Sequence, residues 1–226
     1  MGARVRCGTT GDRGPGRHTA QPPCRRVARS RRGVAHRSPD RKPDDRGARC
    51  CQDRAVHRRD LLRWQFDLVW SLLDYHLQRL TAADFRWEPA ATCWTLRLDA
   101  GGSWVPDWED HEPDPIPVPT IGWIIWHVGW WWSVTIDHTR GRPPRRRTEI
   151  AWPGDGEAVE WLHGLRAEWS AAMEALTDAD LDRIAPFPWQ NDPQRTVAHM
   201  AAWVNAELMK NAAEIGQLRL VRAAQA

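Results

Sequence analysis

Apolar side chains recur every three or four residues in four separate segments of this chain. That spacing places them on one face of an amphipathic helix, and the helix must bury this face against other elements. The four predicted helices cover residues 58–80, 120–139, 156–176 and 192–221. Four long helices, with one long crossover between the first and the second, are typical of an all-α four-helix bundle.

Short sequence signals mark where the helices begin and end. Thr81 and Thr177 are each followed three residues later by an aspartate, which is the pattern of a capping box for one short turn. Asp155 is the expected N-cap of the third long helix. Asp192 followed by Pro193 predicts that the fourth long helix begins there, with the proline at its first helical position.

The predicted helix over residues 120–139 is apolar nearly all round, and it holds five tryptophans and one central histidine, His127. Trp130 and Trp132 point away from the face that carries His127, so this helix either lies centrally or is covered by another subunit. Its apolar run over residues 120–136 is interrupted by His127 and is too short for a membrane span, so we expect a core helix.

Residues 85–119 form a long connection that is rich in tryptophan, proline and acidic side chains. Connections of this length inside a compact domain are usually functional or mobile. Because of its tryptophans, we expect this connection to pack over one end of the fold.

Charge is distributed unevenly along the chain. Residues 1–60 hold 17 of the 32 Lys+Arg and only 6 of the 29 Asp+Glu, a net charge of +11, which leaves −8 for the rest. Residues 1–57 are poor in large apolar side chains and are predicted to be a disordered Arg-rich arm, because they cannot bury enough surface to offset the ordering entropy. All 16 tryptophans follow, so residues 58–226 are the predicted helical domain.

The arm has two interpretations. It could contact nucleic acid or anionic lipid through its arginines. Alternatively it is a non-functional leader, translated ahead of the true start, which we favour because nothing in it is patterned. Only Cys93 of the five cysteines lies in the domain, which suits a reducing cytoplasm. We therefore expect a cytoplasmic protein that binds neither membranes nor nucleic acid.

Three polar residues interrupt the apolar stripe of the last helix. Glu207, Asn211 and Glu214 lie on the face that this helix must bury. A buried carboxylate is costly unless it is paired or bound to a cation. One solution is a divalent metal ion held by His127, Glu207 and Asn211, with open positions for water, which would become a nucleophile near neutral pH. This mixed ligand set is compatible with zinc, nickel, manganese or iron.

The alternative is structural. In that case Glu207 and Glu214 pair with arginine or tryptophan N–H groups, and His127 bonds a backbone carbonyl. From the spacing alone we favour this structural role. His76, on the inner face of the first helix, is a reserve ligand candidate.

Three segments of the chain resemble motifs of one protein family. They are Trp87-Glu88-Pro89 with Cys93-Trp94-Thr95-Leu96-Arg97, the helix start from Thr120 to Val128, and the stretch from Asn205 to Ile215. Their order and spacing over residues 58–226 are similar to the DinB/YfiT-like superfamily, which includes mycothiol-dependent maleylpyruvate isomerase and bacillithiol transferases.

This resemblance implies that His127 is a metal ligand. The family usually has a histidine pair, four residues apart, at the positions of Glu207 and Asn211. Here glutamate is an acceptable ligand, asparagine offers only a weak carbonyl oxygen, and Glu214 is a candidate to support the ligands. The resemblance also implies that homodimers are common, and Trp130 and Trp132 would need cover.

Two functions follow as hypotheses. The first is a metal-dependent hydrolase or low-molecular-weight-thiol S-transferase, which would act on a small-molecule substrate with a mycothiol-type thiol. The second is a non-enzymatic bundle that has lost the ion and binds a partner or a small apolar ligand, with Glu207 neutralised by arginine. Cys93 is expected to be structural, and the sequence identifies no catalytic residue.

Overall fold

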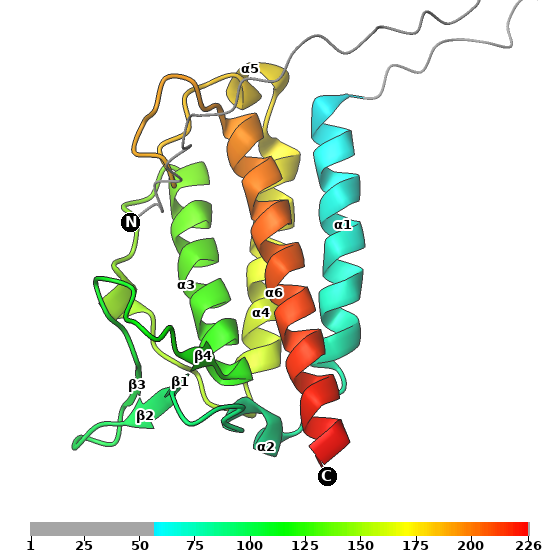
Figure 1. The fold of residues 1–226 in the computed structure, drawn as a ribbon. Coiled ribbons are helices and arrows are strands. Elements are labelled where there is room, and N and C mark those ends of the chain that lie inside the picture. Colours follow the sequence, from blue (N-terminus) through cyan, green and yellow to red (C-terminus); the bar gives the residue numbers. More distant parts are fainter. Residues whose placement is uncertain (1–56, 226) are drawn as a thin grey trace, which may run out of the picture. The chain divides into compact units, whose positions relative to one another are not determined.

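The computed structural model describes residues 57–225, and most of this part of the chain is helical (Figure 1). The predicted arm, residues 1–57, lies outside the described residues except for His57. Four long helices are α1 (Arg58–Leu77), α3 (Ile121–Thr139), α4 (Ala158–Ala175) and α6 (Val197–Gln225). The short helical elements are α2 (Ala82–Phe85), η1 (Arg147–Glu149) and α5 (Asp178–Leu181). The mostly helical fold predicted from the sequence is confirmed.

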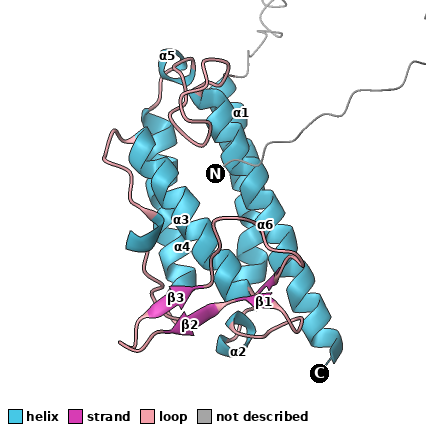
Figure 2. Ribbon diagram, turned by 60° about the vertical axis from the view of Figure 1, so that its left-hand side comes forward, coloured by secondary structure: helices cyan, strands magenta, loops and turns pink. Residues whose placement is uncertain are grey.

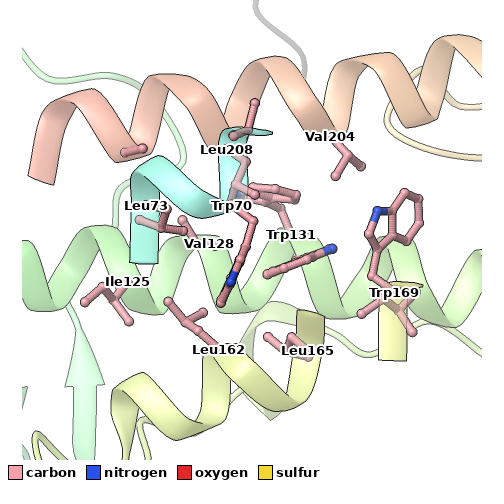
Figure 3. Packing of buried hydrophobic residues seen from close by; sticks show 14 of the residues in the cluster. Trp70, Leu73, Ile125, Val128, Trp131, Leu162, Leu165, Trp169, Val204 and Leu208 are labelled. Atoms are coloured by element: carbon pink, nitrogen blue, oxygen red, sulfur yellow. The ribbon is translucent and has the colours of Figure 1, made fainter. Parts of the chain in front are cut away.

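One apolar core joins the four long helices, and each contributes large side chains to it (Figure 3). Trp70 and Leu73 come from α1, Leu162 and Trp169 from α4, and Leu208 from α6. The helix α3 lies among them, and fifteen of its nineteen residues are buried. Among the described residues, no helix has the length and apolar character needed to cross a membrane.

The burial of Trp132 differs from the expectation that another subunit would cover it. Its side chain is fully buried, and it packs against Phe66 and Trp70 of α1 at ring-centroid distances of 5.8 and 6.0 Å. Trp130 is half-buried and stacks on Trp126. The interpretation that Trp132 needs cover from another subunit was therefore wrong, because α1 of the same chain covers it.

The connection between α2 and α3 contains four short strands that were not predicted. β1 (Cys93–Trp94) pairs in parallel with β4 (Val118–Pro119), and β2 (Leu96–Leu98) pairs antiparallel with β3 (Trp104–Pro106). Figure 2 shows these strands gathered at one end of the helices. The prediction that this connection packs over one end of the fold is confirmed, since Trp94, Trp104 and Trp108 pack against the core.

Both predicted capping boxes are present, at Thr81 before α2 and at Thr177 before α5. The predicted start of the last helix was wrong: α6 begins at Val197, because Ala185 N–H donates to Arg195 O and Val197 N–H donates to Arg183 O. These two bonds flank a bridge between Ile184 and Thr196, which keeps Thr196 outside the helix.

Asp155 does not cap α4 either. The N-cap is Glu157, without a side-chain hydrogen bond. The Asp155 carboxylate instead accepts hydrogen bonds from Arg86 and from the indole N–H of Trp152. An arginine and an indole thus compete successfully with the backbone for this carboxylate.

Candidate functional site

His127 lies between aromatic rings at the middle of α3. Its imidazole stacks on Trp123, with ring centroids 5.0 Å apart and planes 8° apart, and meets Trp130 edge to face at 5.6 Å. Because residues three and four apart share one helix face, these rings are its natural neighbours on α3. The histidine is therefore fixed in orientation by packing from its own helix.

The surroundings of His127 keep it neutral. Burial and, to a smaller extent, the positive charge of Lys210 together lower the pKa of its imidazole to about 4. Removing the imidazolium from water is unfavourable, and a nearby cation adds repulsion. At neutral pH the ring therefore retains a nitrogen lone pair that can accept a hydrogen bond or bind a cation.

The strand-containing connection holds the start of α3 in place. Trp94 stacks on Trp123 with ring centroids 4.9 Å apart, and Trp123 donates its indole N–H to Asp107 O at 2.7 Å. The side chain of Thr120 accepts from the backbone N–H of Trp123 and caps α3. The rings that flank His127 are thus fixed from two sides.

Lys210 is the residue of α6 whose charge acts on His127. Its ammonium lies 3.1 Å from Oε2 of Glu207, one turn earlier on α6, and its charge acts on His127. Sequence reasoning missed Lys210, although one signal was available: it is one of only two lysines among 32 basic residues. Glu207 is thus compensated by a lysine of its own helix, whereas an arginine was expected.

Asn211 lies one turn after Glu207 on α6 and is buried, at 2% exposure. Its Nδ2 donates to Oε2 of Glu214 at 2.9 Å, but its Oδ1 is buried without a hydrogen-bond partner among the described residues. A buried acceptor without a partner costs about 1–3 kcal/mol, so this oxygen is suited to receive a water, a donor or a cation.

These side chains can be compared with the donors that a divalent metal ion prefers. The neutral imidazole of His127 and the free Oδ1 of Asn211 are suitable donors, so both fit. The carboxylate of Glu207 fits once it leaves Lys210, and that ion pair is partly exposed and therefore weak. Within residues 57–225, no three His, Cys, Asp or Glu side chains form a group that could hold a metal. The set with Asn211 stays a prediction.

Two other candidates lie elsewhere. His76 sits at the contact between α1 and α6, where Nδ1 is 3.0 Å from Arg219 and a Cβ on Gly216 would meet Nε2 at 2.6 Å. It is an interhelical packing residue and does not join His127. The thiol of Cys93 donates to Ala90 O at 3.0 Å within the connection, in line with the expected structural role.

Asn205 is a buried polar residue that the sequence analysis missed. Its Nδ2 donates to Leu62 O and to Oε1 of Gln65, both at 3.0 Å, and so ties α6 to α1. It lies two residues before Glu207, about half a turn away and so on the opposite side of the helix, where its partners belong to α1. Its role is structural.

Comparison with known proteins places this fold in a family. The family model of the DinB superfamily matches residues 65–215. A crystal structure described as the conserved protein of locus from Enterococcus faecalis has a TM-score of 0.51 and 10% sequence identity, and the match covers 74% of this chain and 98% of that one. This likeness shows the fold alone. No curated protein matches the sequence. The family match covers well over half of the sequence, and the chain belongs to the DinB superfamily.

Proposed function

We propose that this protein is a metal-dependent enzyme that acts on a small molecule as a hydrolase or a thiol S-transferase, with His127, Glu207 and Asn211 as the ligand set. The observation that carries the proposal is the unpartnered, buried Oδ1 of Asn211. It lies on the same helix as the ion pair of Lys210 and Glu207, and the charge of Lys210 acts on the neutral His127. A polar atom left without a partner in a buried position often marks a functional site.

Each residue has a defined task in this proposal. The imidazole of His127 contributes a nitrogen donor whose direction is set by its stack on Trp123. Glu207 contributes negative charge. Because its carboxylate would have to leave Lys210 to bind a divalent ion, this ion pair would regulate the affinity of the site for the metal. Trp123 and Trp130 shield the imidazole from water. A divalent ion held there would lower the pKa of a water molecule or a thiol, and would so supply a nucleophile near neutral pH.

One observation favours the second candidate function, a bundle that binds a partner or a small apolar ligand without a metal. The Lys210 ammonium already neutralises Glu207, so the stripe does not require a metal for charge balance. In that case the Lys210–Glu207 pair substitutes for the ion, and Asn211 Oδ1 receives a water molecule.

Metal content distinguishes the two candidates. We would purify the full chain, incubate it with zinc, nickel, manganese or iron(II), and measure bound metal by elemental analysis for the native protein, His127→Ala, Glu207→Ala and the control Glu174→Ala. Glu174 is an exposed residue of α4. The enzyme proposal requires near-stoichiometric metal that both site variants lose and the control keeps. If the native protein binds none of the four ions, the metal-free binding function is supported instead.

A second step tests the reaction class. The metal-loaded protein would be screened for ester and amide hydrolysis, and for thiol transfer from mycothiol-type thiols to electrophilic acceptors. Activity that disappears in His127→Ala and persists in Glu174→Ala would assign the reaction to this site. Bound metal without either activity would contradict the proposed enzyme classes.

A further inference from the structure

Arg147 is a half-buried cation that has no acidic partner among the described residues. Within that part of the chain, its side chain takes part in no ion pair and donates no hydrogen bond. The two preceding arginines differ, because Arg145 pairs with Asp137 and Arg146 pairs with Glu149, each at 2.8 Å. A half-buried charge without a counter-ion is unfavourable, so an anion from outside the chain would stabilise it.

The guanidinium of Arg147 lies over the indole of Trp108. Its carbon atom Cζ is 4.5 Å from the ring centroid. This cation–π contact attracts the guanidinium to the ring. Because the side chain donates no hydrogen bond to another described residue, its N–H donors stay available, and a guanidinium can donate two parallel hydrogen bonds to one carboxylate. The free arginine is therefore suited to a planar anion.

Both ends of the segment that carries Arg147 are tied to α3. Before it, Arg145 donates to the carboxylate of Asp137, and after it Ile150 O accepts from the indole N–H of Trp126 at 2.9 Å. Between these ties, η1 forms a single turn. The fold thus sets the position of Arg147 before any ligand arrives, which lowers the ordering cost of binding.

The aromatic cluster around Trp108 connects Arg147 with His127. Trp108 meets Trp130 edge to face at a centroid distance of 5.1 Å, and it lies nearly parallel to Trp123 at 6.4 Å. Trp123 and Trp130 are the two rings that contact His127. Trp108 and Trp130 are half-buried, so part of each ring stays accessible. A flat apolar group bound next to Arg147 would therefore meet an aromatic surface that continues to His127.

Neighbouring carboxylates do not compete for Arg147. Glu149, on the same turn, is bound by Arg146. Glu109 and Asp110, in the connection before α3, are exposed, and neither forms an ion pair with Arg147. Exposed charges are screened by water and salt, so these two acids oppose an incoming anion only weakly.

We propose that Arg147 and Trp108 form a binding site for a carboxylate with a flat apolar body. The guanidinium donates two hydrogen bonds to the carboxylate oxygens, and the rings of Trp108 and Trp130 contact the apolar body. Within the proposed function, on which this second step rests, the site identifies the substrate as a small carboxylic acid whose reacting group lies beside His127. Arg147 then selects the substrate and is separate from the metal ligands.

Binding of benzoate to the metal-free full chain tests this site. A chelator first removes divalent ions, so the carboxylate cannot bind a metal instead, and the affinity is measured by NMR titration of the ligand. Benzamide is the matched probe, because it has nearly the same shape without the charge. The native protein should bind benzoate at least about tenfold more tightly than benzamide, since the amide loses the charged hydrogen bonds.

Two substitutions of Arg147 should grade the affinity. Arg147→Gln should weaken benzoate binding at least about tenfold, and Arg147→Lys, which keeps the charge without the fork of donors, should be intermediate. Arg195→Gln is the matched control, because Arg195 also lies over an indole, that of Trp189, at 5.7 Å. This variant and Lys210→Met should keep the native affinity. Circular dichroism checks that every variant is folded.

The carboxylate site is overturned if the native protein binds no benzoate, if benzamide binds as tightly, or if Arg147→Gln keeps the native affinity. Loss of benzoate binding in Lys210→Met would overturn it as well, since Lys210 would then be the anion receptor.

These outcomes are separate from those of the metal measurement. Glu207→Ala, which removes a proposed metal ligand, should bind benzoate like the native protein. A chain that takes up no metal but binds benzoate through Arg147 would support the carboxylate site and contradict the enzyme. A chain that takes up metal at His127 and Glu207 but binds benzoate without Arg147 would overturn the carboxylate site alone.

Discussion

The ammonium of Lys210 lies 3.1 Å from the carboxylate of Glu207, and its charge lowers the pKa of His127 on the facing helix. One lysine thus acts on two of the three proposed metal ligands. It holds the carboxylate and discourages a second positive charge beside the imidazole. Lys210 is therefore the residue whose removal is most informative about this site.

Replacing Lys210 with methionine should raise the pKa of His127, although burial, the larger cause, will keep it below the ordinary value. The same change frees Glu207, and zinc affinity should increase on the order of tenfold if the residue is a ligand. The pKa would be followed by NMR titration of the imidazole, and the affinity by calorimetry.

Lys210→Arg is the matched control, because it preserves the charge, and it should leave both quantities close to the native values. The two measurements separate the candidate functions. A raised pKa without a gain in zinc affinity would indicate that Glu207 and Lys210 form a metal-free network.

The sequence predicted the long helices well because their apolar spacing is strong. The core positions Leu162 and Trp169 of α4, and Val69 and Leu73 of α1, followed directly from that spacing. Helix starts were predicted less well. Asp192 and Pro193 form a strong local signal, yet long-range backbone bonds to Arg183 and Ala185 delay α6 until Val197.

The site was predicted only in outline. His127 was found because it is a lone polar residue at the middle of an apolar helix. Lys210 was missed because a lysine one turn from a glutamate is common on exposed helix faces. Only the fold shows that the charge of Lys210 acts on His127. Asn205 was missed for the same reason, since its partners are on α1, 140 and 143 residues away.

Stability should depend on pH through His127. Its folded-state pKa, about 4, is lower than the ordinary value of about 6.5, so the unfolded chain binds the proton more tightly. The stabilisation is complete above about pH 6.5 and is lost as the pH falls toward about 4, by up to about 3 kcal/mol. Urea unfolding of the native protein and of His127→Phe at several pH values would measure this contribution.

The difference between the two proteins isolates His127, because burial also lowers the pKa of His76 and His138, and these contribute in the same direction. The native protein should lose more stability than His127→Phe between pH 6.5 and 4. Parallel pH profiles would show that the imidazole is accessible to water and readily protonated.

Gly129 provides a test of the packing between α3 and α4. A Cβ at this position would lie 1.8 Å from the ring of Trp161, so Gly129→Ala must displace the indole. We expect a loss of roughly 1–3 kcal/mol in the free energy of unfolding. Gly164→Ala is the control, since nothing lies within 4 Å of a Cβ there, and in a helix interior it should stabilise by about 0.5–1 kcal/mol. Equal effects of the two changes in thermal or urea unfolding would contradict the close approach of Trp161.

Asp137, near the end of α3, is buried at 3% exposure and anchors the loop that follows. Its Oδ2 accepts from Nε of Arg145 at 2.8 Å, and its Oδ1 lies 2.9 Å from Arg142. Burial raises the pKa of this carboxyl, but the hydrogen bonds from Arg145 and the two positive charges outweigh burial and lower it overall. The carboxylate therefore stabilises the fold above its ordinary pKa, and this stabilisation is lost as the pH falls through the lowered value.

Asp137→Asn should cost about 2 kcal/mol at neutral pH, because charged hydrogen bonds are replaced by weaker ones. The difference from the native protein should begin to narrow below about pH 4, where the carboxyl of the unfolded chain takes up its proton, and should narrow further as the pH falls through the lowered pKa of the folded protein. Asp60→Asn, which alters an exposed pair with Arg59 at 3.5 Å, should change stability by less than about 1 kcal/mol. A constant difference between Asp137→Asn and the native protein across this pH range would mean that the ionised carboxylate is not what holds the loop to α3.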